Sequence, residues 1–196
     1  KVNHEIIFDR IELGTYLIGG ALVGKKIILN KIKPKIVEAE IKVLRKMGVK
    51  MKIEKNKITV FESKKINNIN IKTGPYPGFP TDLQAQIMVL MTKSTGISRI
   101  RESIFENRFM HVPELRRLGA KITTKKNVAI ITGPSNLSGA EVMATDLRAS
   151  VSLILAGLMA KNKTTINRVY HLDRGYENLE KKLKNCKANI RRLKWK

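Results

Sequence analysis

The sequence has few of the residues that form covalent or metal cross-links. Its 196 residues include one cysteine, Cys186, and three histidines without metal-ligand spacing, His4, His111 and His171. One cysteine excludes an internal disulfide and a cluster of thiolate ligands. The longest apolar run, residues 151–160, is too short to span a bilayer. We therefore expect a globular protein of the reducing cytoplasm, with no metal site and no membrane partner.

Aromatic and acidic residues are also scarce. Aromatic residues make up 5% of the chain, too few to form platforms on which nucleic-acid bases would stack. The 39 lysines and arginines exceed the 16 acids, and the formal net charge of +23 would suit a polyanionic partner. The lysines are scattered through the expected helices, strands and turns, however, which is typical of solvated surfaces. We expect no nucleic-acid partner, and a stand-alone basic module that binds nucleic acid stays the alternative.

What the sequence does contain is material for a core and an internal repeat. Hydrophobic residues make up 42% of the chain, enough for one domain. Three segments resemble one another, and each is typical of the end of an amphipathic helix, a turn and a strand. They are residues 44–53, 115–124 and 183–192. A more apolar helix and then a strand are expected before each of them. The apolar helices are predicted at 14–24, 82–91 and 146–160.

The repeat predicts a closed arrangement of three units. Its period of roughly 65 to 70 residues is longer than that of solenoid repeats, so the copies are expected to close on themselves. The helix at 146–160 is apolar on nearly every side, which predicts burial where the units meet. The sequence thus indicates the α/β (α+β) class, with helices inside and sheets outside. The expected repeats are 11–62, 80–133 and 143–194.

The turn of the third copy departs from the other two. Gly48 and Gly119 occupy a position where a left-handed turn is expected after the helix, and Lys187 stands there in the third copy. If that conformation is kept, the lysine costs about 1 kcal/mol. Cys186 aligns with apolar residues of the other copies and is expected to be a buried thiol.

The segment TDLQ raises the question of what Asp82 does. Thr81 is expected to cap a helix, with Gln84 as its capping-box partner and Asp82 in the first turn. A favourable interaction with the helix dipole is the simpler explanation of Asp82. The preceding YPGFP is a stiff, aromatic loop, however, and an unusual way to begin an ordinary helix. That loop favours a functional role for Asp82.

Two arginines lie near predicted helix starts. In TDLRAS, Thr145 is the expected cap, Asp146 lies in the first turn and Arg148 follows. A cation there opposes the helix dipole, so Arg148 is expected to pair with Asp146 or with a bound anion. Arg174 of DRGYE is placed at another helix start, and two such arginines could hold a phosphate or carboxylate. For each arginine alone, a surface salt bridge stays the alternative.

Four longer motifs make the chain resemble the enolpyruvyl transferases. They are PGFPTDLQAQ (77–86), IFENRFMHVPELRRLGA (104–120), GAEVMATDLRAS (139–150) and YHLDRGYE (170–177). The resemblance runs from about Asp9 to the C-terminus and is closest to the bacterial branch that acts on UDP-N-acetylglucosamine. The sister branch that acts on 3-phosphoshikimate, which stays an alternative, is not expected to carry IFENRFMHV.

The resemblance implies an enzyme of two domains, each an inside-out α/β barrel of three repeated units. The resemblance implies that residues 1–196 are the C-terminal domain and that the missing N-terminal domain is its partner. The start at Lys1, in the middle of a pattern, also leads us to expect that the true N-terminus is missing. The implied reaction transfers the enolpyruvyl group of phosphoenolpyruvate to the 3-hydroxyl of UDP-N-acetylglucosamine and releases phosphate, without a metal or organic cofactor. This is the first committed step of peptidoglycan synthesis, and it links the protein to cell wall biogenesis, cell shape, cell division and the cell cycle.

The same resemblance suggests roles for single residues. Asp82 is expected to be the base near the sugar hydroxyl, and Asp146 a second catalytic carboxylate beside the reacting centre. The residues expected to bind the substrates are Asp82 and Ile104 for the UDP-sugar, Arg148 and Arg174 for phosphoenolpyruvate, and Asp9 for ordering the closed state. The family's reactive cysteine belongs to the N-terminal domain, and Cys186 lies in no matching motif. The chain is therefore expected to hold half of an active site.

Overall fold

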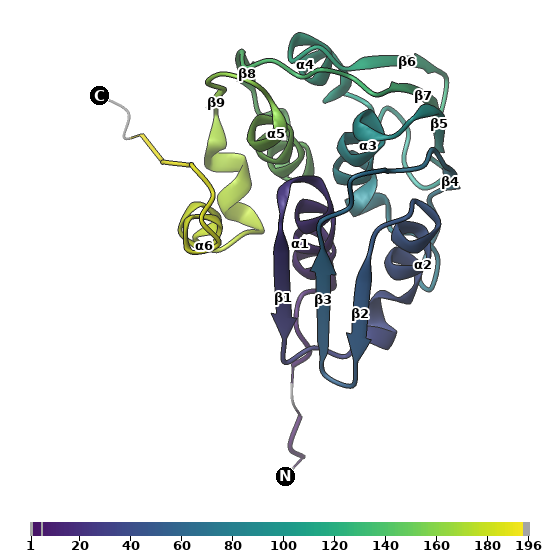
Figure 1. Cartoon of the computed structure of the whole chain (residues 1–196), viewed down its shortest axis with the longest axis vertical. Coiled ribbons are helices and arrows are strands. Elements are labelled where there is room, and N and C mark those ends of the chain that lie inside the picture. The colour runs from purple at the N-terminus through teal and green to yellow at the C-terminus, as the bar shows by residue number, and fades with distance from the viewer. Residues whose placement is uncertain (1, 5, 194–196) are drawn as a thin grey trace.

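The computed structural model of the protein describes residues 2–4 and 6–193, in which helices are interspersed with single strands and with runs of strands (Figure 1). The α-helices are α1 (Arg10–Val23), α2 (Glu38–Lys46), α3 (Gln84–Lys93), α4 (Val112–Arg117), α5 (Leu147–Met159) and α6 (Leu179–Asn185). The 3-10 helices are η1 (Pro34–Val37), η2 (Thr81–Leu83) and η3 (Val169–Arg174). The strands are β1 (Lys26–Asn30), β2 (Met51–Glu54), β3 (Lys57–Phe61), β4 (Asn70–Lys72), β5 (Gly96–Arg101), β6 (Lys121–Lys125), β7 (Val128–Gly133), β8 (Glu141–Met143) and β9 (Thr165–Asn167). The expected mixture of helix and sheet is confirmed.

The strands of the described chain form three sheets. The first has the antiparallel order β1-β3-β2, with Ile28 opposite Thr59. The second has the order β4-β5-β7-β6, in which β4 runs parallel to β5 and the other pairs are antiparallel. The third is the parallel pair β8-β9. The sequence analysis predicted most of these strands but missed β4 and β8, which have three residues each.

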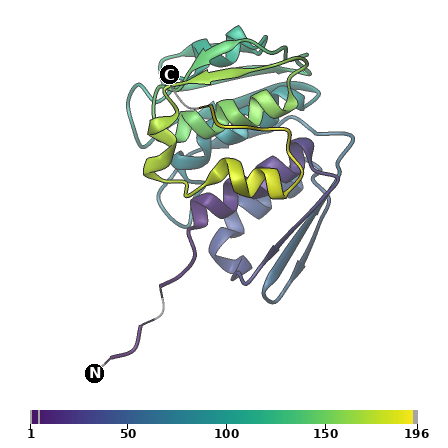
Figure 2. The ribbon, with the colours of Figure 1, turned by 90° about the vertical axis from the view of Figure 1, so that its left-hand side faces the viewer.

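Helices α1, α3 and α5 pack against one another in the interior and lie between the sheets (Figure 2). β1 and β3 contact α1, and β5 and β7 contact α3. Residues 84–92 of α3 are all buried, as are residues 149–156 of α5. A helix without a polar face is stable where other elements surround it. The expected central burial of the helix at 146–160 is confirmed.

The element order repeats in the first two units, and the third unit is shorter. α1, β1, α2, β2 and β3 correspond to α3, β5, α4, β6 and β7. The strand expected near residues 188–192 is wrong, because 188–193 form no strand, and residue 194 lies outside the described residues. β2 pairs with β3, and β6 with β7. The third unit has no such neighbour within the described chain, and an extended segment needs one to satisfy its backbone groups.

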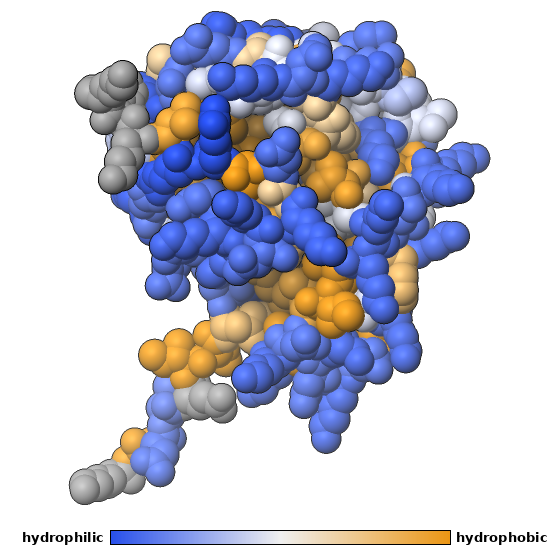
Figure 3. Space-filling view, turned by 60° about the vertical axis from the view of Figure 1, so that its left-hand side comes forward, coloured by the Kyte–Doolittle hydropathy of each residue, from blue (hydrophilic) through white to orange (hydrophobic). Residues whose placement is uncertain are grey.

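The missing strands change the surroundings of Cys186, which is exposed, so the expected buried thiol is wrong. Its counterparts Met47 and Leu118 are fully buried in units that carry an outer sheet. Cys186 instead lines an open groove of about 430 Å³ between α1, α5 and α6. Figure 3 shows the molecule from the side of α6, with apolar side chains in a hollow between hydrophilic ones. Within the described residues, no helix is both long enough and apolar enough to cross a membrane.

The left-handed turn predicted at Gly48 and Gly119 is confirmed, and the third unit keeps this conformation at Lys187. The backbone φ is +83° at Gly48, +96° at Gly119 and +65° at Lys187. We expect Lys187→Gly to raise the free energy of unfolding by about 1 kcal/mol, because glycine adopts this conformation without strain. Urea unfolding followed by circular dichroism measures the change. The matched control is Lys181→Gly, an exposed position inside α6, where the same exchange should lower the stability by about 1 kcal/mol. Equal losses in the two variants would contradict the prediction.

Candidate active site

Asp82 lies in η2, the short turn that leads into α3. Pro80 occupies the N-cap position, and the predicted capping box of Thr81 and Gln84 is wrong. The Thr81 hydroxyl donates to Oε2 of Glu102 at 2.9 Å, and the Gln84 side chain is buried. Asp82 is in the first turn, as predicted. Because the helix begins with a 3-10 turn, its carboxylate is turned away from the backbone and toward other side chains.

The Asp82 turn is fixed on both sides. Before it, the N–H of Gly74 donates to the carbonyl of Phe79 at 2.9 Å, which closes the aromatic loop, and Phe79 is buried. After it, Leu83 is buried against α1. A Cβ at Gly14 would lie 2.2 Å from Cδ1 of Leu83, so glycine at this position of α1 permits the close approach. The loop therefore has little freedom to move Asp82.

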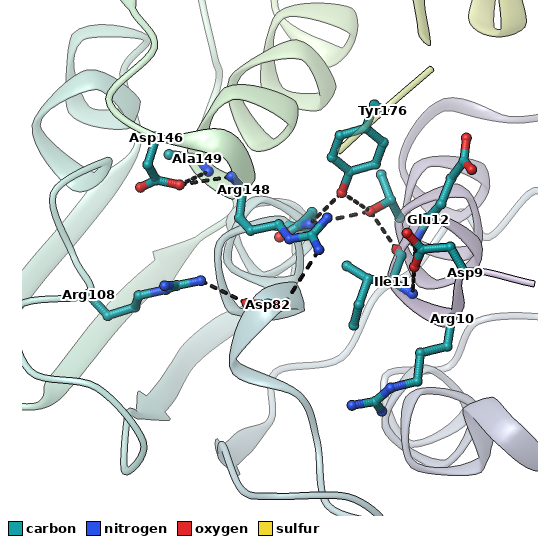
Figure 4. A network of polar contacts seen from close by, with 12 residues as sticks. Asp9, Arg10, Ile11, Glu12, Asp82, Arg108, Asp146, Arg148, Ala149 and Tyr176 are labelled. Carbon is teal, nitrogen blue, oxygen red and sulfur yellow. Dashed lines mark hydrogen bonds and ion pairs between the residues drawn. The ribbon is translucent and has the colours of Figure 1, made fainter. Parts of the chain in front are cut away.

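Two guanidinium groups meet the Asp82 carboxylate (Figure 4). Nη2 of Arg108 lies 2.9 Å from Oδ1, and Nη2 of Arg148 lies 3.5 Å from Oδ2. Of the two partners that the sequence suggested for the Arg148 guanidinium, Asp146 is corrected to Asp82, and a bound anion stays a prediction. The Asp82 side chain is 38% exposed, whereas Arg148 is 16% exposed. A carboxylate accepts about four hydrogen bonds, so Asp82 keeps room for a hydroxyl proton from the open side.

A buried polar cluster lies behind Arg148. The guanidinium lies over the ring of Tyr176, 5.5 Å from its centre. The Tyr176 hydroxyl is 2.9 Å from Oγ1 of Thr15 on α1 and accepts from Nε2 of Gln86 on α3 at 3.4 Å. All three partners are at most 2% exposed, and burial raises the pKa of Tyr176 above its ordinary value. The uncharged side chains of Thr15, Gln86 and Tyr176 thus pack on the buried side of the Arg148 guanidinium.

Sequence reasoning missed this cluster and Arg108. The signal that could have revealed the cluster is the presence of Thr15 and Gln86 on helices that are otherwise apolar, because a buried polar group needs a partner. Arg108 lay inside a motif with other polar residues, and nothing in its spacing pointed to Asp82.

The N-cap of α5 lies one residue later than the sequence predicted. Asp146 is this N-cap, and the predicted cap, Thr145, has a buried hydroxyl with no hydrogen-bond partner among the described residues. Oδ1 of Asp146 accepts from the N–H of Arg148 at 2.8 Å and from that of Ala149 at 2.9 Å. Asp146 therefore fixes the backbone from which Arg148 reaches toward Asp82.

Asp9 caps α1 in the same manner. Its Oδ1 accepts from the N–H of Ile11 at 2.7 Å and from that of Glu12 at 3.1 Å. Asp9, Asp82 and Asp146 stand at the starts of the three interior helices, and the close-up shows the three starts around one region (Figure 4). Two of these carboxylates are used as helix caps, and Asp82 is used for ion pairs. Asp9 itself has no contact with the Asp82 cluster among the described residues.

Ile104 and Arg174 lie outside the ion-pair cluster. Ile104 is 40% exposed in the loop that also carries Arg108, and its N–H donates to Oε1 of Glu102 at 2.8 Å. Arg174 ends η3 and does not begin a helix, so its predicted placement is wrong. It is exposed and has no ion pair within residues 2–4 and 6–193. The next residue, Gly175, abuts Leu147, where an added Cβ would lie 2.9 Å from Cδ1, so Arg174 stays near the start of α5.

His111 is a buried histidine beside the site. It is 1% exposed, and Nε2 has no hydrogen-bond partner among the described residues. Burial lowers the pKa of His111 from 6.5 to about 4, the positive charge of Arg108 acts in the same direction, and the negative charge of Asp146 opposes both. His111 is therefore a neutral imidazole near pH 7.

The polar groups of the site suit an anion better than a cation. Arg108 and Arg148 outnumber the one carboxylate they contact, and Nη1 of Arg148 is buried without a hydrogen-bond partner in the described chain. Across residues 2–4 and 6–193, no three His, Cys, Asp or Glu side chains come close enough to hold a metal ion. A guanidinium nitrogen without a hydrogen-bond partner is suited to a phosphate or carboxylate oxygen.

The fold and the site agree with comparisons to known proteins. The sequence model of EPSP synthase (3-phosphoshikimate 1-carboxyvinyltransferase) matches residues 1–183, and the chain belongs to this family. It is 58% identical over 193 residues to UDP-N-acetylglucosamine 1-carboxyvinyltransferase of Pelagibacter ubique, a match that covers 98% of this chain and 46% of that protein. The protein of the same name from Caulobacter sp. (strain K31) is 51% identical over the same length, with 45% of it covered. The chain thus spans under half the length of the curated relatives it matches.

Solved structures give the same result. The enolpyruvyl transferase NikO from Streptomyces tendae superposes with a TM-score of 0.87 at 30% identity, covering 95% of this chain and 44% of NikO. EPSP synthase from Acinetobacter baumannii superposes with a TM-score of 0.65 at 16% identity, covering 83% of this chain and 40% of that one, and it supports the fold alone.

The buried His111 predicts a dependence of stability on pH. Between pH 6.5 and about 4 the unfolded chain binds a proton at His111 that the folded chain does not, so stability falls as the pH falls. From pH 7.5 to 4.5 this histidine should contribute a loss of about 2 to 3 kcal/mol. Urea unfolding at both pH values, with the parent and His111→Gln, isolates that contribution. His4→Gln, at an exposed histidine, is the matched control and should keep the parent's dependence. The same dependence in His111→Gln would rule the assignment out.

Proposed function

We propose that this chain is the C-terminal domain of an enzyme that transfers the enolpyruvyl group of phosphoenolpyruvate to the 3-hydroxyl of UDP-N-acetylglucosamine and releases phosphate. The observation that carries the proposal is Asp82 between Arg108 and Arg148, in a chain 58% identical to a relative that bears the name of this activity. The reaction belongs to peptidoglycan synthesis in the cytoplasm, and through cell wall biogenesis it serves cell shape, cell division and the cell cycle.

Asp82 acts as the general base. It accepts the proton of the sugar 3-hydroxyl while the oxygen attacks C2 of phosphoenolpyruvate, and a proton adds to C3 from an acid in the remainder of the protein. The product of this addition is a tetrahedral carbon that carries the phosphate. The C2–O bond to phosphate then breaks and a proton leaves C3, which forms the enol ether. Asp82 suits the first step because it is 38% exposed and rigidly held.

The arginines stabilise the negative charge of phosphoenolpyruvate and of the departing phosphate. Nη1 of Arg148 is a buried donor without a partner in the described chain, which supports its role as an anion anchor. Arg174 is exposed beside the start of α5 and provides a second cation. We place Arg108 with them, because it shares Asp82 with Arg148.

The other predicted residues have supporting roles. Ile104 offers its exposed side chain to the UDP-sugar, since its N–H is bound to Glu102. Asp146 and Asp9 use Oδ1 for capping in the described contacts. We propose that the second oxygen of Asp146 serves the reacting centre and that Asp9 orders the closed state. We also propose that this domain is an inside-out barrel of three units. The missing N-terminal domain of the same protein is its partner and completes the site.

The experiment that tests this proposal uses the full-length protein encoded by the gene. Phosphate release from phosphoenolpyruvate is measured with UDP-N-acetylglucosamine or with 3-phosphoshikimate as the second substrate. We expect phosphate release when UDP-N-acetylglucosamine is the second substrate and none when 3-phosphoshikimate is, because the 51–58% identical relatives bear that enzyme's name. Release with 3-phosphoshikimate alone would replace this proposal with the sister activity.

The role of Asp82 predicts a large effect of Asp82→Asn in the same assay. Asparagine keeps the size of the side chain and an oxygen for Arg108 but does not take up the hydroxyl proton, so kcat should fall about 10²- to 10⁴-fold. The matched control is Glu38→Gln, the same acid-to-amide change at an exposed ion pair with Lys42 on α2, which should leave kcat unchanged. Turnover of Asp82→Asn close to that of the parent would remove Asp82 from the role of base.

A further inference from the structure

We propose that Glu102 is a positioning residue, which fixes Asp82 and Arg108 relative to each other and to Ile104 without touching the substrates. The inference rests on the proposed function, because its effect is seen in that reaction. Glu102 follows β5 directly and is 2% exposed. The four family motifs do not include Glu102, which lies two residues before IFENRFMHV.

Four donors from three segments of the chain bind the Glu102 carboxylate. Oε1 accepts from the hydroxyl of Thr73 at 2.8 Å, from the N–H of Ile104 at 2.8 Å and from that of Phe105 at 3.3 Å. Oε2 accepts from the hydroxyl of Thr81 at 2.9 Å. A buried carboxylate is costly unless hydrogen bonds replace its water. Glu102 has no ion pair with any described residue, so these four bonds supply the compensation.

The four bonds reach both partners of the Asp82–Arg108 ion pair. Thr81 directly precedes Asp82 and is held through Oε2. Phe105 is held through Oε1, and Arg108 lies over its ring, 5.2 Å from the centre. One carboxylate thus fixes the base on one side and the arginine that contacts it on the other.

Thr73 ties the aromatic loop to the same point. Its hydroxyl donates to Glu102 and accepts from the N–H of Ser103 at 3.0 Å, and its carbonyl accepts from the Ser103 hydroxyl at 2.6 Å. The loop that leads to Asp82 and the loop that carries Ile104 are therefore joined at their bases. Glu102 sets the distance between the base for the sugar hydroxyl and the exposed apolar side chain proposed to contact the UDP-sugar.

Because the two oxygens of Glu102 bind different segments, the hydrogen bonds of each oxygen can be tested separately. Thr81→Val keeps the branched shape and removes the bond that holds the Asp82 turn. Because a misplacement of about 1 Å can cost roughly a hundredfold in rate, we expect kcat to fall at least about tenfold, with KM for UDP-N-acetylglucosamine within about twofold of the parent. Glu102→Ala removes the hydrogen bonds of both oxygens, and it should lower kcat and also raise the KM for UDP-N-acetylglucosamine. Thr81→Ser, which keeps the hydroxyl, should recover most of the kcat lost in Thr81→Val.

The matched control is Ser98→Ala on β5. The Ser98 hydroxyl is fully buried and accepts from the N–H of Ile69 at 3.1 Å, so this variant also loses a buried hydrogen bond in the same sheet. Melting temperatures of all variants report the cost to stability. A general structural role would lower kcat equally in Thr81→Val and Ser98→Ala at similar melting temperatures. That outcome overturns the inference, as does a failure of Thr81→Ser to recover kcat when it folds.

The same experiment separates failure of this inference from failure of the proposed function. If the full-length parent releases no phosphate with either second substrate, the proposed function is wrong, and the inference about its reaction falls with it. If the parent is active with UDP-N-acetylglucosamine and Thr81→Val is as active as Ser98→Ala, the function stands and the positioning role of Glu102 is rejected. Should Thr81→Val not fold, the split between kcat and KM in Thr81→Ala decides, because alanine also lacks the hydroxyl that binds Glu102. A lowered kcat with the parental KM supports the inference, and a parental kcat rejects it.

Discussion

The mutual burial of α1, α3 and α5 is the constraint on which the rest of the structure depends. These helices have too few polar positions to face water, so they pack against one another and receive the sheets on their outer sides. Packing them this closely brings their starting residues together, as the contact of Gly14 with Leu83 and the ion pair of Asp82 with Arg148 demonstrate. The region where the starts meet combines the positive ends of helix dipoles with arginines. The hydrophobic core therefore determines where an anion is best received.

The polar groups inside this core are explained by the same region. Thr15, Gln86 and Tyr176 lie where aliphatic side chains would pack at lower cost, because each buried polar atom must find a partner. Their hydrogen bonds link α1, α3 and the segment after η3, which fixes the three elements relative to one another. The ring of Tyr176 then supports the guanidinium of Arg148 from the buried side. These buried polar groups cost packing energy, and in return they hold the guanidinium of Arg148 in one place.

Local patterns in the sequence were sufficient for the three interior helices and for the place of Asp82 in a first helical turn, because apolar periodicity over a few neighbouring residues marks each helix. They failed where a distant residue decides the outcome. Thr81 has the chemistry of an N-cap, but Glu102, far along the chain, takes its hydroxyl. Cys186 has the alignment of a core residue, but the strands that would cover it are not among the described ones. Arg108 finds Asp82 only after the loop between β5 and α4 has folded.

The three aspartates at the interior helix starts show how equivalent positions acquire different functions. At Asp9 and Asp146 an α-helix begins immediately, and two backbone N–H groups bind the carboxylate. At Asp82 the helix begins with a 3-10 turn after Pro80, and arginines bind the carboxylate instead. A carboxylate bound by backbone donors stabilises its helix, whereas one that faces side chains at an open surface can exchange a proton with a ligand. The difference between the two capping aspartates and the proposed base therefore lies in the geometry of one helical turn, which Pro80 and the buried Glu102 impose from either side.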